Sequence, residues 1–203
     1  ARAAYIGGAA GTATVLAGKQ FGIPVGGTMA HSYVMYYQDE LTAFRKYAAI
    51  YPDNCILLVD TIDVLKSGVP HAIEVFREMQ AAGIPLTVYG IRLDSGDLAY
   101  LSKKARKMLD EAGFPDARIV VSNSLDEYTI TSILDQGGCI NSFGVGERLI
   151  TAKSDPVFGA VYKIAAVNRD GKFEPRIKIS ESVEKITNPG LKEVYRVYDE
   201  EGH

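Results

Sequence analysis

The densest group of chemically active side chains lies at residues 90–98, where the sequence reads Gly-Ile-Arg-Leu-Asp-Ser-Gly-Asp-Leu. The guanidinium of Arg92 can give two parallel, charge-assisted hydrogen bonds to a phosphate or a carboxylate. Asp94 and Asp97 supply carboxylates that would accept ribose hydroxyls or hold a magnesium ion through water, and Ser95 adds a hydroxyl between them. The alternative is structural: an ion pair between the arginine and an aspartate, with Asp97 capping the helix that follows.

Two further residues, His31 and Asp60, have the chemistry of a nucleophile and its partner. His31 lies in the glycine-rich run 26–32 at a junction between loop and helix, where an imidazole can act as base or nucleophile. Asp60 ends an apolar run and would orient His31 or bind a metal. A structural histidine and a capping aspartate are the alternatives. His71 follows Pro70 near a helix start, so we expect it at the surface or as a cap.

Two more polar or glycine-rich segments follow apolar runs. Ser122 and Asn123 end one such run, and Gly144 and Gly146 follow the next. Backbone N–H groups of glycines after a strand can form a concave site for phosphate. A tight turn is the alternative, since two glycines separated by one residue are common in turns.

These side chains follow four apolar runs that we expect to be buried strands, because the runs lack the alternation of a strand with one face in solvent. The predicted strands are 55–60, 86–91, 118–123 and 142–146. The predicted helices between them are 69–82, 98–112 and 126–134. Strands that alternate with helices form a parallel sheet. Every strand ends in polar residues, which favours a (β/α) barrel, where all such ends converge on one mouth, over an open sheet. The strands are too few to close a barrel.

The pattern changes after Lys153. Residues 160–167 and 176–179 read as two strands of a hairpin joined through 168–171, and residues 194–198 read as a further strand. We therefore predict a barrel core at 1–153 and a small antiparallel β appendage at 154–203.

Composition limits the classes of function. The formal net charge is -3 and 47% of the residues are hydrophobic, so neither nucleic-acid nor membrane binding is expected. No apolar run reaches the length of a transmembrane helix. Cys55 and Cys139 lie in apolar runs and are expected to be buried free thiols of a cytoplasmic protein. The chain begins at Ala1 without a methionine, and we expect it to be a piece of a longer protein.

Taken together, the segments resemble the nicotinate phosphoribosyltransferase family in their order and spacing. The resemblance covers most of the chain and rests on residues 27–32, 58–61, 90–97, 122–127, 144–146, 178–180 and 184–190. It implies the fold of the type II phosphoribosyltransferases, a TIM-like α/β barrel with a flanking domain, incomplete in this chain. It also implies a homodimer.

The resemblance implies an activity as well. Family members join nicotinate to 5-phosphoribosyl 1-pyrophosphate, giving nicotinate mononucleotide and pyrophosphate on the way to NAD. The reaction is coupled to ATP hydrolysis through a phosphorylated histidine and uses Mg2+. The transition state resembles a ribosyl cation, so the site must hold anions and stabilise positive charge.

Roles carry over to the matching positions. By resemblance, His31 is the phosphorylated histidine and Asp60 orients it. Arg92 and Asp94 bind the charged and ribose groups of the nucleotide. Neighbouring polar residues complete the substrate site: Ser95, Asp97, Ser122, Asn123, Gly144 and Gly146, with Lys178 and Lys185 reaching pyrophosphate.

The sequence also departs from the family pattern. Ala10 and Ala13 stand in a loop where a polar or acidic residue is expected. The resemblance also implies an N-terminal domain that stacks an aromatic ring on the pyridine, and we expect that domain to lie outside these residues. We therefore expect residues 1–203 alone to be inactive and poorly stable. A nicotinamide or quinolinate phosphoribosyltransferase and a non-catalytic nucleotide-binding homologue remain as alternatives. A barrel lyase would need a lysine at a strand end, and none is found.

Overall fold

The computed structural model describes residues 1–151, 161–179 and 186–199. The chain divides into two compact units, Ala1–Ala30 and His31–His203. The predicted boundary between barrel core and appendage, at residues 153 and 154, lies outside the described residues. Within the first unit, α1 (Arg2–Ile6) and α2 (Val15–Phe21) accompany a single parallel bridge between Thr12 and Val25.

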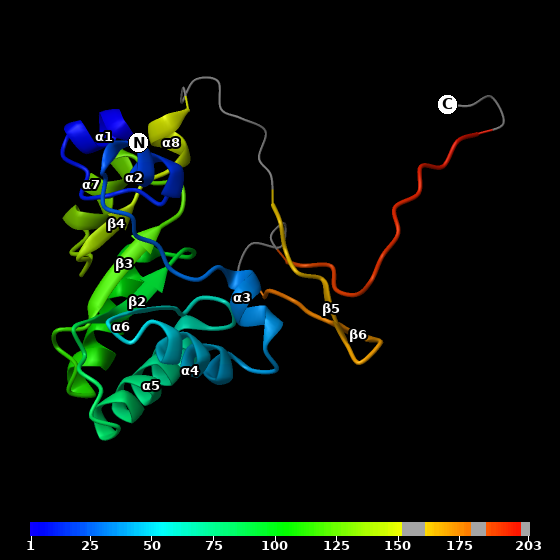
Figure 1. Ribbon diagram of the computed structural model, residues 1–203, viewed down its shortest axis with the longest axis horizontal. Coiled ribbons are helices and arrows are strands. Elements are labelled where there is room, and N and C mark those ends of the chain that lie inside the picture. Colours follow the sequence, from blue (N-terminus) through cyan, green and yellow to red (C-terminus); the bar gives the residue numbers. More distant parts are fainter. Residues whose placement is uncertain (152–160, 180–185, 200–203) are drawn as a thin grey trace. The chain divides into compact units, whose positions relative to one another are not determined.

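The second unit contains a parallel sheet whose four strands follow one another in sequence order (Figure 1). They are β1 (Asn54–Leu58), β2 (Val88–Leu93), β3 (Arg118–Ser122) and β4 (Ser142–Gly144). All four predicted strands are thus confirmed. The described strands form an open sheet, and a closed barrel is not seen among them.

Helices connect and cover these strands. They are α3 (His31–Tyr36), α4 (Glu40–Ile50), the π-helix η1 (Val64–Gly68), α5 (Val69–Ala81), α6 (Leu98–Glu111), α7 (Glu127–Asp135) and α8 (Glu147–Ile150). The three predicted helices, α5 to α7, are confirmed. An aspartate side chain accepts a backbone N–H at the start of four of the helices: Asp39 of α4, Asp63 of η1, Asp97 of α6 and Asp126 of α7. No helix in the described part of the chain is long and apolar enough to cross a membrane.

The core lies where α5 and α6 pack on the sheet. Phe76 of α5 makes edge-to-face contacts with Tyr89 of β2 and with Phe114, at ring-centroid distances of 5.1 and 5.7 Å. Phe76 and Phe114 are almost wholly buried, and each such side chain contributes about 1.5–3 kcal/mol by leaving water. This packing fixes the strands that carry the polar residues.

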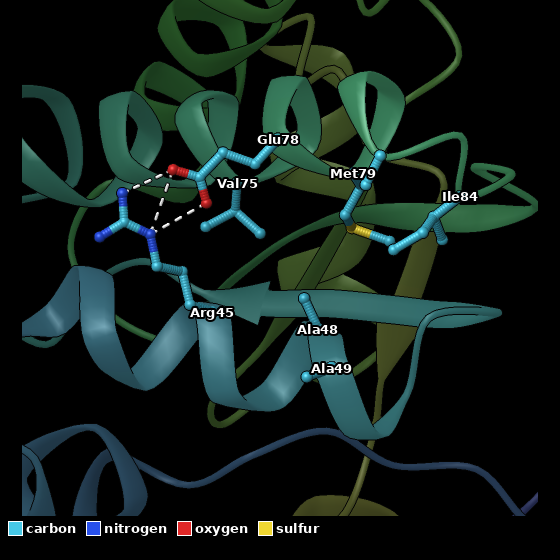
Figure 2. A pocket seen from close by; sticks show the side chains of 8 residues that line it. Arg45, Ala48, Ala49, Val75, Glu78, Met79 and Ile84 are labelled. Carbon is cyan, nitrogen blue, oxygen red and sulfur yellow. Dashed lines mark hydrogen bonds and ion pairs between the residues drawn. The ribbon is translucent and has the colours of Figure 1, made fainter.

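Helices α4 and α5 lie side by side (Figure 1) and enclose a shallow groove on their outer surface. Figure 2 shows its apolar floor, formed by residues such as Val75 and Met79, and an ion pair at its rim. Arg45 Nε lies 2.9 Å from Glu78 Oε2, and both side chains are 44% exposed. Exposed ion pairs of this kind add little stability, so the apolar contacts hold the two helices together.

The predicted appendage is a hairpin with bounds that differ from the prediction. Its strands are β5 (Ala166–Arg169) and β6 (Lys172–Pro175), paired antiparallel. Asp170 and Gly171 both have positive φ, which is the geometry of a two-residue turn that keeps the flanking residues paired. The strands predicted at 176–179 and 194–198 are wrong for the described residues, because β-prone composition makes a strand only where a partner strand is in register.

Close packing at Gly68 fixes where β1 ends. A Cβ atom at Gly68 would lie 1.9 Å from the carbonyl oxygen of Val59, the residue before Asp60. Only glycine therefore allows the end of η1 to press against the end of β1.

We predict that Gly68→Ala destabilises the full-length protein by about 1–3 kcal/mol, because the added methyl group forces the backbone apart. Denaturant unfolding followed by circular dichroism measures the change. Gly26→Ala is the control, since no atom lies within 4 Å of the position of its Cβ. Equal stability of the two variants would contradict the prediction.

Candidate active site

The strand register brings the predicted site residues to one edge of the sheet. Leu58 pairs with Arg92, and Arg92 pairs with Val120 on the next strand. The residues just beyond these pairs therefore line up across the carboxyl ends of β1, β2 and β3. Asp60, Asp94 and Ser122 stand at this edge, as the sequence predicted from parallel strands.

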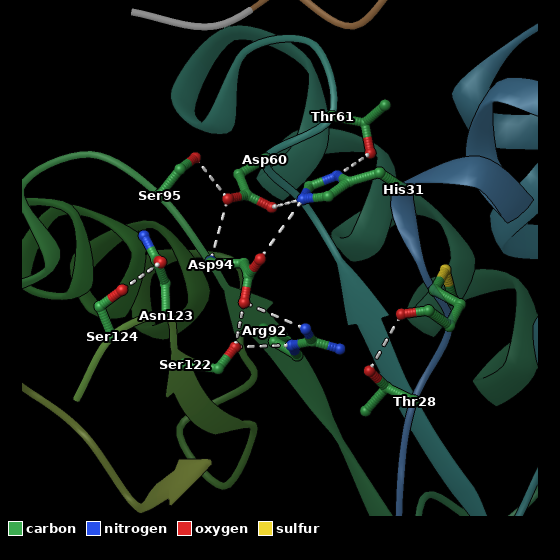
Figure 3. Close-up of polar contacts among 11 residues, drawn as sticks. Thr28, His31, Asp60, Thr61, Arg92, Asp94, Ser95, Ser122, Asn123 and Ser124 are labelled. Carbon is green, nitrogen blue, oxygen red and sulfur yellow. Dashed lines mark hydrogen bonds and ion pairs between the residues drawn. The ribbon is translucent and has the colours of Figure 1, made fainter. Parts of the chain in front are cut away.

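His31, the first residue of α3, contacts three side chains at this edge (Figure 3). Its Nδ1 lies 3.0 Å from the hydroxyl oxygen of Thr61. Its Nε2 lies 3.6 Å from Asp60 Oδ1 and 3.7 Å from Asp94 Oδ2. One ring nitrogen thus faces a hydroxyl and the other faces two carboxylates.

Asp60 joins three segments of chain at the site. Its Oδ2 accepts hydrogen bonds from the backbone N–H of Asp94, at 2.9 Å, and from the hydroxyl of Ser95, at 2.6 Å. Its Oδ1 is buried, has no hydrogen-bond partner in the described part of the chain, and faces His31. A buried carboxylate oxygen without a donor is costly, so this oxygen would stabilise positive charge that develops on the ring during a reaction.

Arg92, Asp94 and Ser122 form a second polar group beside the first. Arg92 Nε donates to the Ser122 hydroxyl at 2.9 Å, and Nη2 lies 3.1 Å from Asp94 Oδ1. The Ser122 hydroxyl also donates a short hydrogen bond to the same carboxylate oxygen. The ion pair that the sequence left open as a structural alternative is therefore formed.

The charge of Asp94 is set by its neighbours. Burial raises the pKa of its carboxyl, but three neighbouring groups outweigh burial and hold that pKa well below its usual range. The His31 ring and the Ser122 hydroxyl contact the carboxylate, and Arg92 adds positive charge. Asp94 is therefore an anion at neutral pH, next to both a cation and an imidazole.

The backbone after β3 is held in an unusual conformation. Asn123 and Ser124 have φ values of 90° and 52°, in the left-handed region that glycine prefers. The Ser124 hydroxyl lies 3.2 Å from Asn123 Oδ1, which supports the turn. Such strain commonly marks a functional segment, consistent with a role for Asn123 in binding.

A polar hollow lies beside this turn. Asp97 and Asn123, both predicted to bind substrate, line it together with Arg148. Asp97 also caps α6 by accepting from the N–H of Tyr100, the alternative left open by the sequence. Nη1 of Arg148 lies 2.6 Å from Oδ2 of the buried Asp126, and this ion pair fixes the position of the guanidinium.

The remaining predicted residues are placed as follows. Gly144 ends β4 beside Ser122, and Gly146 stands before α8 with no atom within 4 Å of the position of its Cβ. Lys178 is buried after β6, where its backbone pairs with Thr187, and it is not among the side chains that contact His31. Lys185 lies outside the described residues.

Sequence reasoning missed two contacts at this edge. Thr61 follows Asp60 directly and was visible only as part of a polar strand end, because nothing local shows which way its hydroxyl points. Arg148 follows the glycine pair and could have been suspected as a cation beside a phosphate-type turn. Among the described residues no three aspartate, glutamate, histidine or cysteine side chains gather into a metal site.

The geometry defines a class of protein: an α/β protein with its polar site at the carboxyl edge of a parallel sheet. That site holds a histidine, two carboxylates and an arginine. The family model described as "Nicotinate phosphoribosyltransferase (NAPRTase) family" matches residues 4–200. The chain belongs to this family.

Relatives agree with this assignment. The chain is 56% identical over its whole length to nicotinate phosphoribosyltransferase of Bacillus subtilis, and 38% identical to that of Dictyostelium discoideum. It spans 41% of the length of each of these curated relatives. The crystal structure of human nicotinic acid phosphoribosyltransferase is similar with a TM-score of 0.59 and 26% identity, over 70% of this chain and 38% of that one.

The lowered pKa of Asp94 predicts a pH-dependent contribution to stability. The folded state binds fewer protons at Asp94 than the unfolded state, so the contribution is complete at neutral pH and shrinks as pH falls below about 5. The excess stability of the wild type over Asp94→Asn should therefore decrease on acidification. Thermal unfolding of both proteins between neutral pH and pH of about 4 measures it, and a difference that grows on acidification would refute the assignment.

Proposed function

We propose that the protein joins nicotinate to 5-phosphoribosyl 1-pyrophosphate, releasing nicotinate mononucleotide and pyrophosphate in the biosynthesis of NAD. Membership of the family and the names of its relatives support this activity. The observation that carries it is the position of His31, between a hydroxyl and two carboxylates at the edge of the parallel sheet.

We further propose that the sheet is one arc of a TIM-like barrel of the type II phosphoribosyltransferases. Neighbouring strands of such a barrel follow each other in sequence, as β1 to β4 do, whereas a doubly wound sheet reverses its order at a switch point. The converging polar strand ends agree with this interpretation. A homodimer in the cytoplasm is part of the same proposal.

The proposal gives His31 the role of phosphoryl acceptor for ATP. With the Nδ1 proton donated to Thr61, Nε2 has a free electron pair and is the nucleophile. A bond forms between Nε2 and the γ-phosphorus as the bond to the ADP oxygen breaks, and ADP takes the electron pair. The ring then carries positive charge, which Asp60 and Asp94 stabilise at distances below 4 Å.

The other residues of the edge bind the nucleotide. We propose that the planar guanidinium of Arg92 binds phosphate or carboxylate, while Asp94, Ser95 and Asp97 accept ribose hydroxyls. The turn at Ser122 and Asn123 and the glycines Gly144 and Gly146 offer backbone N–H groups, and Lys178 and Lys185 are the proposed pyrophosphate contacts.

Mg2+ is proposed to accompany the substrates. It would neutralise phosphate charge, and this ion commonly binds through one or two carboxylates together with substrate phosphates, which suits a site whose described acids do not form a cage. Asp60 and Asp94 are the carboxylates able to hold it, and the unpartnered Oδ1 of Asp60 is the best placed oxygen.

The role of His31 is tested with His31→Ala in the full-length protein. The wild type should incorporate acid-labile, base-stable phosphate from radiolabelled ATP, and the variant should incorporate none while keeping its circular dichroism spectrum. Nicotinate, nicotinamide and quinolinate are compared as substrates in the same preparation. Phosphate incorporation by His31→Ala, or turnover of nicotinamide or quinolinate in place of nicotinate, would overturn the corresponding part of the proposal.

The role of Arg92 is tested with Arg92→Lys. Lysine keeps the charge but loses the planar fork, so the affinity for nicotinate mononucleotide should fall by about 1–3 kcal/mol. Titration calorimetry measures the affinity. Arg77→Lys, on the exposed side of α5, is the control and should bind as the wild type does; unchanged binding by Arg92→Lys would contradict the proposed contact.

A further inference from the structure

A buried carboxyl group lies next to the site without contacting His31. Glu40 is the first residue of α4, and its side chain is fully buried. Its Oε2 lies 2.9 Å from Nδ1 of His71, and its Oε1 has no hydrogen-bond partner among residues 1–151, 161–179 and 186–199. An acid in this position is costly, so its presence requires a reason.

Glu40 lies nine residues after His31, at the start of the next helix. Helix α3 begins at His31, and α4 begins at Glu40. The ring of Tyr33 in α3 packs edge-to-face on that of Tyr47 in α4, at a centroid distance of 6.0 Å. Because Tyr47 is buried, this ring contact helps to fix the packing of α3 against α4.

His71 stands on the piece of chain that follows Asp60 and Thr61. It lies in the first turn of α5, which continues directly from η1. The side chain of Asp63 caps η1, and the far end of η1 packs against the Val59 carbonyl at Gly68. The contact between Glu40 and His71 therefore connects α4 and α3, which begins at His31, to the segment that carries Asp60 and Thr61.

We propose that Glu40 and His71 form a positioning pair that holds His31 in register with Asp60 and Thr61. The pair acts through the backbone of α3, α4 and η1 and does not touch the reacting atoms. This inference rests on the proposed function, in which His31 reacts and a displacement of about 1 Å is enough to slow the reaction severely.

Electrostatics link the pair to the site as well. Burial raises the pKa of Glu40, and the charge of Asp60 raises it further. His71 lowers the pKa, as does the nearby Ser67 hydroxyl, which gives its own hydrogen bond to the Asp63 carbonyl. These groups lie on α5, on η1 and in the loop after β1.

The experiment compares two interactions between α4 and α5 in the full-length protein, the buried Glu40–His71 contact and the exposed Arg45–Glu78 ion pair. Glu40→Ala removes the buried contact, and Glu40→Gln keeps the shape of the side chain and an acceptor for His71. His71→Ala breaks the same contact from a side chain that is one-third exposed and leaves Glu40 itself in place. Glu78→Ala is the matched control, since it removes the exposed tie to Arg45 shown in Figure 2.

Two readouts are taken well below the unfolding temperature of each variant. The first is the rate at which diethyl pyrocarbonate acylates His31, followed on its peptide by mass spectrometry. The second is kcat and KM for nicotinate. We expect Glu40→Ala and His71→Ala to acylate several-fold faster and to lose about tenfold in kcat with little change in KM, whereas Glu40→Gln and Glu78→Ala stay near the wild type.

The thermal stabilities of Glu40→Gln and Glu78→Gln, each relative to the wild type, should change in opposite directions as pH rises. The folded state binds more protons at Glu40 than the unfolded state, so Glu40→Gln gains stability relative to the wild type as pH rises above the usual glutamate range. The pKa of Glu78 is lowered by Arg45, so Glu78→Gln loses relative stability as pH rises through that range. Changes of the same sign would overturn the electrostatic part of the inference.

The outcomes separate this inference from the proposed function. The inference fails if, in both Glu40→Ala and His71→Ala, His31 is acylated and nicotinate is turned over at the rates of the wild type. The pair is then merely structural. If the wild type does not turn over nicotinate, the proposed function fails, while the acylation rates still decide whether the pair positions His31.

Discussion

The carboxylate of Asp60 is the interaction on which the rest of the site depends. One oxygen accepts from the backbone and side chain that follow β2, and the other faces the His31 ring. A single buried charge thus joins three segments that lie far apart in the sequence. Because an uncompensated charge in the interior is very unfavourable, the segments cannot separate without large cost, and the site is assembled when the sheet folds.

The parallel arrangement of the strands brings these segments together. The strands all end at the same edge, so residues placed just after each strand meet without special loops. Four of the helices begin in the same way, with an aspartate side chain that accepts a backbone N–H of the first turn: α4, η1, α6 and α7. Aspartate therefore serves both structure and chemistry here, and Asp97 shows that one position can serve the first while lining a polar hollow.

Local patterns predicted the elements and the edge, whereas contacts across the chain could not be predicted. The buried strands and the helices α5 to α7 follow from apolar runs, caps and glycines, which act over a few residues. The Thr61 contact depends on a side-chain direction set by packing. His71, expected at the surface or as a cap, is instead bound to a buried glutamate 31 positions away. Hairpin bounds near β5 and β6 depended on two left-handed residues that composition does not reveal.

The hydroxyl of Thr61 has a consequence for how the imidazole can change charge. A hydroxyl is both donor and acceptor and rotates freely, so it keeps the contact with Nδ1 whether or not that nitrogen carries a proton. The ring can therefore pass through its tautomers and its cationic form with no movement of heavy atoms around it. Proton exchange at His31 therefore requires little reorganisation of the atoms around it, whereas a valine in place of Thr61 would keep the shape and lose this adaptable contact.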